Sequence, residues 1–433
     1  MGDARREPEA GEHRLRGGCE HGGVEHDLAR AYAEALDTIL RGAHLMDPDA
    51  LPDLAAAGAA HLGAVSTVLW LVDYEQANLV PLLRHGSGPR ERLSVDGTLA
   101  GRAFRSVEPV EVETEGGRRL YVPMLDGVER LGVLEVVVHT EAAALDDGLH
   151  RMFGQLAHLI AELFISKSAC TDHYEWFRRQ QAMALPAEMQ HSLLPPLTFG
   201  TSRVVISGLV APAYEVGGDA FDYALNGNLM HVAVFDAIGH GLQASLLATL
   251  AVSCYRNARR AGLDLADTAA RVDSTLQEMF SSEKFVTALL GQLDLDTGEF
   301  RWVNAGHPAA MLMRGTQVVK ELDGEPSLPL GLNHLVGAGP SSFPVSVESL
   351  QPGDRLLLIT DGVDEARTED GEFFGRTRLA EFAAREAASG LATPEVMRRL
   401  QQAILRHQTG QLQDDATTVF VEWLTARNER LAL

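Results

Sequence analysis

Residues 285–306 form two apolar runs around a turn at residues 294–298, and this hairpin is the feature that most constrains the fold. So short a turn joins only antiparallel strands, because parallel strands need a crossover of a dozen or more residues. Further strands are predicted at residues 203–210, 228–237, 309–314, 354–360 and 416–424, and helices at 242–261, 265–279 and 376–388. Antiparallel strands with helices in blocks indicate an α/β sandwich of the α+β class, rather than a doubly wound parallel sheet.

A separate α+β unit is predicted from the pattern that precedes this sandwich. It contains helices at residues 28–40, 52–62 and 97–106, strands at 66–73 and 78–84, and a hairpin at 119–138 with Asp126 and Gly127 in its turn. The polar, Gly-rich residues 1–27 are expected to be a disordered tail. We therefore expect an N-terminal domain at 28–167, a helical connector at 168–196, a second domain at 197–424 and a short tail at 425–433.

The helices that lead to the second domain carry one apolar stripe, formed by Met152, Phe153, Leu156, Leu159, Ile160, Leu163 and Phe164. Such a stripe must be buried against something. We predict a contact between subunits of a homodimer; the alternative is packing against its own domain. Pro186 lacks an N–H and should kink or restart the connector helix.

Charge and cysteine content limit the classes of binding partner and the cellular compartment that we expect for the chain. The formal net charge of −23 argues against nucleic acid or an anionic membrane as a partner, since both attract basic surfaces. Three scattered cysteines form no CxxC pair, so a disulfide framework is not expected. Residues 230–255 are strongly apolar but contain Asp236 and His240, so no transmembrane segment is predicted. We expect a cytoplasmic protein.

Aspartates recur where the predicted strands meet turns of small residues. Asp219 follows two glycines, Asp236 and Asp361 follow apolar runs, and Asp414 with Asp415 precedes the last strand. A single such aspartate is usually a turn former. If several converge, however, their charges repel unless cations neutralise them.

Oxygen ligands alone suit Mg²⁺ or Mn²⁺. No HExxH motif or CxxC pair favours zinc. Two such ions close together would suit phosphate hydrolysis.

Seven motifs occur in a fixed order: VGGDAFDY, FDAIGHGLQAS, NAGHPAAML, LPLGL, LQPGDRLLLITDGVDEAR, FGRTRL and DDATTVFV. Together they resemble the SpoIIE-like serine phosphatases of the PPM (type 2C) family, over residues from about 185 to 424. The resemblance implies an αββα sandwich and two Mn²⁺ or Mg²⁺ ions. It also implies attack of metal-bound hydroxide on phosphoserine or phosphothreonine, without a phosphoenzyme.

By this resemblance, Asp219, Asp236, Asp361 and Asp414 are the acidic metal ligands and catalytic residues. Asp236 and Asp361 bridge or flank both ions, and the carbonyl of Ala237 completes one coordination sphere. Asp415, His240 and Gly218 are weaker candidates. His307, Asp222 and Asp364 also belong to the motifs, and for these we expect structural roles.

Two residues depart from the family pattern. Phe235 stands where a small residue commonly precedes the motif aspartate, and it should narrow the space beside the metals. Pro186 interrupts a helix that usually continues into the SLLP segment, which puts a rigid lever-arm signal in doubt.

The first domain resembles a GAF sensory domain in its pattern of elements, so a small molecule is a candidate ligand there. We therefore predict a signalling phosphatase regulated by its N-terminal domain. The resemblance suggests a phosphorylated STAS-type anti-sigma-factor antagonist as substrate. A non-catalytic partner-switching scaffold and a metallohydrolase of small phosphates or nucleotides remain alternatives.

Overall fold

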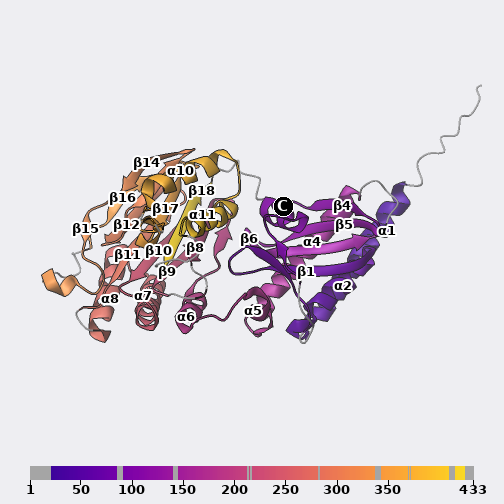
Figure 1. The fold of residues 1–433 in the computed structure, drawn as a ribbon, viewed down its shortest axis with the longest axis horizontal. Helices are drawn as coiled ribbons and strands as arrows, with labels where there is room; N and C mark the ends of the chain where they lie inside the picture. Colours follow the sequence, from indigo (N-terminus) through magenta and orange to yellow (C-terminus); the bar gives the residue numbers. More distant parts are fainter. Residues whose placement is uncertain are drawn as a thin grey trace, which may run out of the picture.

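The computed structural model shows two domains beside each other along the long axis of the molecule (Figure 1). The N-terminal domain is built on one β-sheet, and the C-terminal domain on two. The structure describes residues 21–84, 91–139, 145–211, 214, 217–280, 283–336, 343–368, 370, 372–408 and 415–424. Within these residues, no helix combines the length and the apolar composition that crossing a membrane requires.

The sheet of the N-terminal domain has six antiparallel strands in the order β3-β2-β1-β6-β5-β4. They are β1 (Ala64–Val72), β2 (Asn78–Pro81), β3 (Leu93–Ser94), β4 (Val110–Thr114), β5 (Gly117–Asp126) and β6 (Glu129–Val138). The predicted hairpin is confirmed: β5 pairs with β6, and Gly127 in the turn has a φ of 57°. Glycine adopts this left-handed conformation without steric cost. The sequence analysis missed β3 and β4.

Helices cover both faces of this sheet. On one face lie α1 (His21–Ala43), the short 3₁₀ helix η1 (Pro48–Ala50), α2 (Leu51–His61) and α4 (Asp147–Ser168). On the other face lies α3 (Leu99–Ser106), where Phe104 packs in a core with Trp70. Successive strand residues point to opposite faces, so Leu69 joins the first core and Trp70 the second. Helix α1 includes residues 21–27, which the sequence analysis placed in the tail.

The apolar stripe of α4 packs inside its own domain. Phe153, Leu156, Ile160 and Phe164 all belong to the core that α1 and α2 share with the sheet. Side chains buried in this way cannot form a second contact with another subunit. The predicted inter-subunit contact through this stripe is therefore wrong, and the alternative, packing on its own domain, is confirmed.

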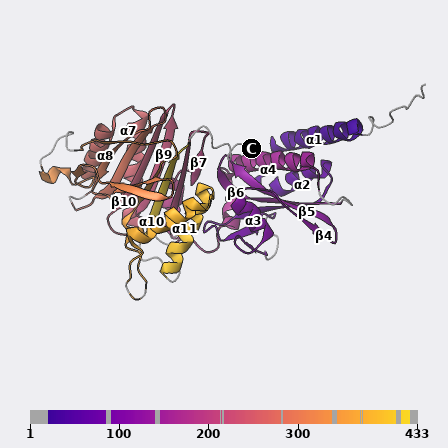
Figure 2. The same cartoon turned by 90° about the horizontal axis from the view of Figure 1, so that it is seen from above.

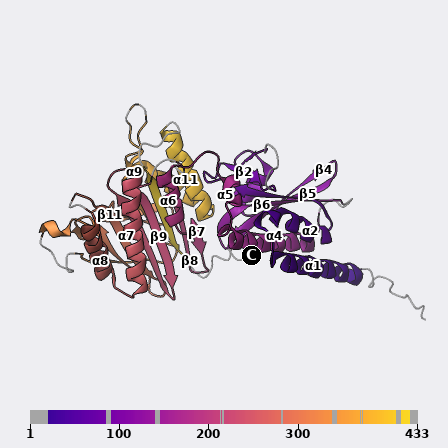
Figure 3. The same cartoon turned by 90° about the horizontal axis from the view of Figure 1, so that it is seen from below.

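Two short helices join the domains. Helix α5 (His173–Arg178) places Tyr174 and Phe177 in the N-terminal core. Helix α6 (Leu185–Leu193) packs against α7 of the C-terminal domain, and Figure 3 shows the two side by side. Pro186 lies in the first turn of α6, where an N–H would have no partner within the helix. The predicted restart at Pro186 is confirmed.

The C-terminal domain contains two sheets. In the first, the order is β15-β12-β11-β10-β9, with β16 also paired to β12; in the second it is β14-β13-β17-β18-β8-β7. The first comprises β9 (Asp219–Asn226), β10 (Leu229–Ala237), β11 (Val286–Asp294), β12 (Glu299–Ala305), β15 (Pro326–Ser327) and β16 (Ser346–Ser349). The second comprises β7 (Thr198–Gly200), β8 (Val204–Ala211), β13 (Ala310–Arg314), β14 (Gln317–Leu322), β17 (Arg355–Ile359) and β18 (Ala416–Trp423).

Helices cover the outer face of each sheet, which gives an αββα order of layers. Helices α7 (Leu242–Arg260) and α8 (Leu265–Met279) pack on the first sheet. Helices α9 (Asp361–Asp364), α10 (Gly375–Ala388) and α11 (Thr393–His407) pack on the second. Figure 2 shows these two sets of helices on opposite sides of the domain. A 3₁₀ helix, η2 (Asn333–Val336), lies between β15 and β16.

A third core of this domain lies between the two sheets. Strand β10 contributes to this core and to the core between the first sheet and its helices. Val234 points into the core between the sheets, whereas Phe235 points outward to α7 and packs edge-on against Tyr255. The αββα sandwich expected from the sequence is thus present. Strands β7, β9, β14, β15 and β16 and helices α9 and α11 were not predicted from the sequence.

Candidate metal centre

Two of the predicted aspartates are paired across neighbouring strands. Asp219 begins β9 and Asp236 is the second-to-last residue of β10, and their Cα atoms are partners in the antiparallel register. Asp219 is buried, with 3% of its surface exposed, and Asp236 is half-buried. The hairpin register therefore brings the two carboxylates to the same end of the first sheet.

Asp415 joins this pair from the second sheet. Its Oδ2 accepts hydrogen bonds from the backbone N–H of Gly218 at 2.5 Å and of Asp219 at 3.3 Å. Asp415 directly precedes β18 and is itself buried. A carboxylate from one sheet thus holds the turn that carries Asp219 on the other. Asp415 was the weaker candidate of the sequence analysis, and its position is that of a residue that fixes the turn.

Asp361 lies between residues that touch both of these groups. Thr360 Oγ1 donates a hydrogen bond of 2.6 Å to Asp219 Oδ2 and accepts one of 2.9 Å from the N–H of Thr417. On the other side, Gly362 leaves no room for a side chain, because a Cβ there would lie 1.8 Å from the carbonyl oxygen of Asp415. Asp361 itself is exposed in the first turn of α9. Its chain neighbours therefore place it at the rim of the carboxylate cluster.

The electrostatics of the cluster are unfavourable without a cation. Burial raises the pKa of Asp219 well above its ordinary value, and the negative charges of Asp236 and Asp415 raise it further. Hydrogen bonds from Thr360 and Thr417 oppose this shift without reversing it. A divalent cation at this position would offset the repulsion among the carboxylates.

The donor atoms at this end of the sheets suit a hard cation. They are carboxylate oxygens and the backbone carbonyl of Ala237. This carbonyl lies next to Gly218, because a Cβ on Gly218 would be 3.2 Å from its oxygen. The missing side chain of Gly218 thus leaves space beside that carbonyl. Oxygen ligands of this kind are those that Mg²⁺ and Mn²⁺ prefer. By its chemistry, the donor set fits the predicted ions.

The described carboxylates make up only part of the predicted ligand set. Asp414, the fourth predicted ligand, lies outside the described residues. Among the residues that are described, no group of three or more His, Cys, Asp or Glu side chains is close enough to hold a metal ion. By themselves, Asp219, Asp236 and Asp415, with Asp361 beside them, are therefore an incomplete set of ligands.

Three residues that sequence reasoning did not select support the aspartates. Besides Thr360, Thr287 stands opposite Asp236 in the β10–β11 register, with its Oγ1 3.5 Å from Asp236 Oδ2. Gln190 of α6 donates a hydrogen bond of 2.7 Å to the backbone carbonyl of Asp219. A hydroxyl within an apolar strand run was the available signal for Thr287 and Thr360. The contact of Gln190 had no such signal, because it depends on how α6 packs.

The two candidate histidines occupy different environments. His307 is buried, and its Nδ1 lies 2.9 Å from Thr287 Oγ1. Burial lowers the pKa of His307 to about 3, so the imidazole is neutral at physiological pH. It contacts the carboxylate cluster through Thr287. His240 is exposed between Gly239 and Gly241, both with positive φ.

Two further motif aspartates form ion pairs with arginines. Asp222 accepts hydrogen bonds of 2.7–2.8 Å from Arg256 and 2.7 Å from Arg259 of α7. Asp364 accepts one of 2.7 Å from Arg376. The first contacts join α7 to β9 and the last joins α10 to α9, which agrees with the structural roles expected for both aspartates.

The expected effect of Phe235 is wrong. Its ring lies in the core between the first sheet and α7, on the face of β10 opposite to its neighbours in the strand. It therefore fills the helix layer and does not narrow the space between the sheets where Asp236 and Asp219 meet.

Comparison with known proteins gives the family of this domain. Residues 226–424 match the family model described as stage II sporulation protein E (SpoIIE). Phosphoserine phosphatase RsbU of Bacillus subtilis is 22% identical over 236 residues, which cover 54% of this chain and 68% of that protein. Stage II sporulation protein E of Bacillus subtilis is 24% identical over 214 residues, which cover 48% of this chain but only 24% of the relative.

Solved structures show a related likeness. The crystal structure of the RsbU and RsbW domains of a Mycobacterium tuberculosis protein is 29% identical, with a TM-score of 0.43. The match covers 52% of this chain and 62% of that one. The match to the family model lies in the C-terminal half of the chain. Over residues 226–424, the C-terminal domain is therefore similar to the SpoIIE family of phosphatases.

Proposed function

We propose that this protein is a metal-dependent serine/threonine protein phosphatase that acts on a phosphorylated partner protein in signal transduction. The observation that carries the proposal is the meeting of Asp219, Asp236 and Asp415 from two sheets, where burial and then the charges of Asp236 and Asp415 raise the pKa of Asp219. This cluster lies in and beside a SpoIIE-family domain, and a relative of that domain is named a phosphoserine phosphatase.

Two Mn²⁺ or Mg²⁺ ions would be held by Asp219, Asp236, Asp361, Asp414 and the carbonyl of Ala237. When bound, such ions neutralise charge on the phosphoryl oxygens and make water a better nucleophile. The remaining residues orient these ligands. Thr360 holds one oxygen of Asp219, and Asp415 holds the turn at Gly218.

Positioning of this kind matters because ligands held by hydrogen bonds lose little entropy when the metal binds. His240, which is exposed and follows Asp236 by four positions, is a candidate contact for the phosphoryl group.

The substrate that we propose is a phosphoserine or phosphothreonine on a STAS-type anti-sigma-factor antagonist. The net charge of −23 would repel an acidic phosphoprotein at long range. Recognition must therefore depend on local contacts and on the cations at the carboxylate cluster. We further propose that the N-terminal domain is a GAF-like sensor that regulates this activity.

Phosphate release from a phosphorylated STAS-domain protein, measured with Mn²⁺, tests the proposal. The matched pair of variants is Asp236→Asn, in the cluster, and Asp323→Asn, an exposed aspartate between β14 and β15. We expect Asp323→Asn to keep the wild-type rate and Asp236→Asn to lose nearly all of it.

Three outcomes of this assay would contradict the proposal or its assigned site. Binding of the phosphoprotein without turnover by the wild type would indicate a scaffold. Faster turnover of nucleotides than of the phosphoprotein would indicate a hydrolase of small phosphates. Equal rates for the two variants would remove the assignment of the site.

A further inference from the structure

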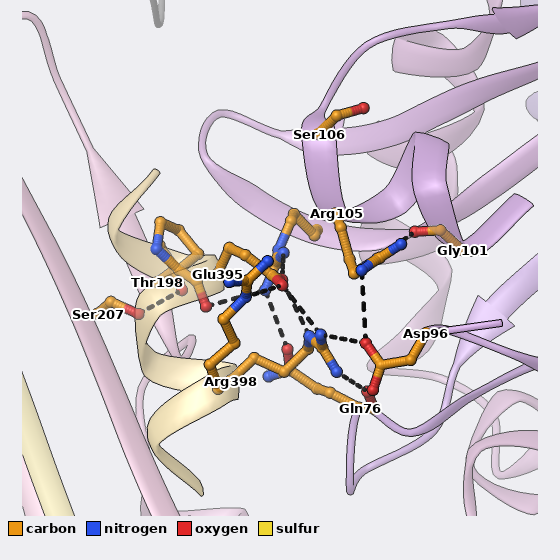
Figure 4. Close-up of polar contacts among 12 residues, drawn as sticks. Gln76, Asp96, Gly101, Arg105, Ser106, Thr198, Ser207, Glu395 and Arg398 are labelled. Carbon is orange, nitrogen blue, oxygen red and sulfur yellow. Dashed lines mark hydrogen bonds and ion pairs between the residues drawn. The ribbon is translucent and has the colours of Figure 1, made fainter. Parts of the chain in front are cut away.

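An arginine of the N-terminal domain forms hydrogen bonds with helix α11 of the C-terminal domain. Arg130 on β6 donates a hydrogen bond of 2.8 Å from Nη1 to Glu395 Oε2, and one of 2.9 Å from Nη2 to the carbonyl of Pro394. Figure 4 shows Glu395 of α11 within this group of contacts between the two domains. The contacts join positions about 265 residues apart in the chain.

A second arginine, Arg398 of α11, makes the converse contact from the C-terminal domain to the N-terminal domain. Its Nε and Nη2 each donate to the Glu395 carboxylate at 2.9 Å, and Nη2 also donates to Asp96 Oδ1 of the N-terminal domain at 2.7 Å. We call Asp96, Arg130, Glu395 and Arg398 the Glu395 cluster. Its charges alternate in sign across the domain boundary, so each domain supplies one cation and one anion.

The Glu395 cluster touches helix α3 from two sides. The guanidinium of Arg130 lies over the ring of Phe104, 4.6 Å from its centroid, and Phe104 is part of the core between α3 and the sheet. Arg105, the next residue of α3, has its Nη1 3.7 Å from Asp96 Oδ1. A shift of α3 against the sheet would therefore move the groups that hold α11.

The ionic groups of the Glu395 cluster that lie between the domains are buried. Glu395, Arg398 and Arg130 are 0%, 1% and 6% exposed. Burial alone would raise the pKa of Glu395, but the hydrogen bonds from Arg398 and the charge of Arg130 outweigh it and hold that pKa below its ordinary value. Arg399 also donates a hydrogen bond of 3.0 Å to Glu395 Oε1, so the carboxylate has three arginine partners. Loss of a buried partner is still more costly than loss of an exposed pair. Partial loosening is thus disfavoured.

Helix α11 is also connected to the strand that follows Asp415. At its first residue, Thr393 Oγ1 donates a hydrogen bond of 2.7 Å to Glu422 Oε2 near the end of β18. Movement of α11 would therefore reach β18, the strand that Asp415 directly precedes.

We propose that the N-terminal half of α11 is the surface through which the N-terminal domain acts on the C-terminal domain, with the Glu395 cluster as the coupling contact. A displacement of α3 is transmitted through Asp96 and Arg130 to α11. This coupling goes beyond the proposed phosphatase activity and does not depend on it. No helix spans residues 179–184, between α5 and α6, so the two domains are not joined by one continuous helix. The Glu395 cluster is a contact between the domains that is separate from this connector.

Hydrogen exchange measured by mass spectrometry on the full chain tests the coupling without any assumption about catalysis. The first variant is Asp96→Asn, because the Asp96 side chain is half exposed and its loss leaves the buried ions of the cluster paired with one another. The amides of α11 should exchange about two- to fivefold faster, the factor expected for one partly exposed ion pair. The matched control is Arg102→Gln, an exposed residue of α3 outside the cluster, which should leave α11 unchanged.

The reciprocal variant is Arg398→Gln, which should accelerate exchange in α3 by more than about tenfold because it removes a buried partner. Arg406→Gln, an exposed arginine at the other end of α11, is its control. In the double variant, Asp96→Asn should add nothing to Arg398→Gln, since both break the same contact.

Unchanged exchange in α11 on Asp96→Asn would overturn the proposal. So would an equal acceleration in α8, which packs on the other sheet, because that would show general loosening rather than coupling.

Discussion

The hydroxyl of Thr360 donates a 2.6 Å hydrogen bond to the carboxylate of Asp219, although 141 positions separate the two residues. Thr360 directly follows β17 of the second sheet, and Asp219 is the first residue of β9 in the first sheet. This single contact joins the two sheets at the point where the carboxylates gather. The negative charges of Asp236 and Asp415 act on the same carboxylate and, after burial, raise its pKa.

Removal of that hydroxyl should weaken metal binding. Thr360→Val keeps the shape of the side chain but loses the donor, and loss of such an orienting group typically costs 10- to 100-fold in metal affinity. Thr360→Ser keeps the hydroxyl and should remain within about threefold of wild type by the same reasoning. Titration with Mn²⁺ followed by calorimetry distinguishes the two variants. Equal affinities for Thr360→Val and wild type would show that Thr360 does not orient Asp219.

Gly362→Ala should disturb both the fold and the site. A Cβ at Gly362 would lie 1.8 Å from the backbone oxygen of Asp415, so the segment that carries Asp361 must move. We expect a loss of about 1–3 kcal/mol in the free energy of unfolding, as for other overpacked positions. Gly154→Ala in α4 meets no atom within 4 Å and is the matched control, expected to be neutral or slightly stabilising. Urea denaturation measures both. Equal stability of the two variants would contradict the packing described here.

His231 should make the protein sensitive to acid. Burial first, and then the charge of Arg259, lower the pKa of His231 to about 4 from its ordinary value of 6.5. The unfolded chain therefore binds a proton that the folded chain does not, and stability falls as the pH decreases from 6.5 towards 4. The slope is at most about 1.4 kcal/mol per pH unit.

The variant His231→Gln removes this titration. Its stability relative to wild type, measured by urea denaturation, should therefore improve between pH 7 and pH 5. A relative stability that is the same at both pH values would contradict the shifted pKa of His231.

Metal removal should reveal the repulsion within the carboxylate cluster. Mn²⁺ at about 100 times its dissociation constant should raise the free energy of unfolding by about 2.7 kcal/mol, and a chelator should reverse the gain. Asp219→Asn should lose this response but be more stable than wild type in the presence of the chelator, because a buried anion is gone. Thermal unfolding with and without Mn²⁺ shows both effects. A chelated variant less stable than chelated wild type would contradict the raised pKa of Asp219.

Local patterns in the sequence predicted most elements but not their partners. The hairpin at residues 294–298 and the turn at Gly127 are determined by nearby residues, and both were predicted correctly. The α4 stripe was identified, but a stripe shows only that a face is buried, not by what. Thr360 and Asp219 could not be paired from sequence, since their contact exists only after both sheets have formed.

Two of the missed elements, β9 and α11, were missed for a common physical reason. Strand β9 carries Asp219 and Asp222 at positions that an apolar strand pattern would exclude, and each is satisfied by a distant partner. Helix α11 buries Glu395 and Arg398, so its apolar period is masked by charges whose partners lie in the other domain. Sequence patterns record burial as apolar character. Buried charges therefore hide the elements that contain them.

Direct titration of the metal-free protein with Mn²⁺ tests the central claim, that aspartates from both sheets form one cation site. We predict saturable binding of two ions by the wild type, unchanged binding by Asp323→Asn, and loss of saturable binding by Asp236→Asn. A binding curve for Asp236→Asn that overlays the wild-type curve would contradict the site.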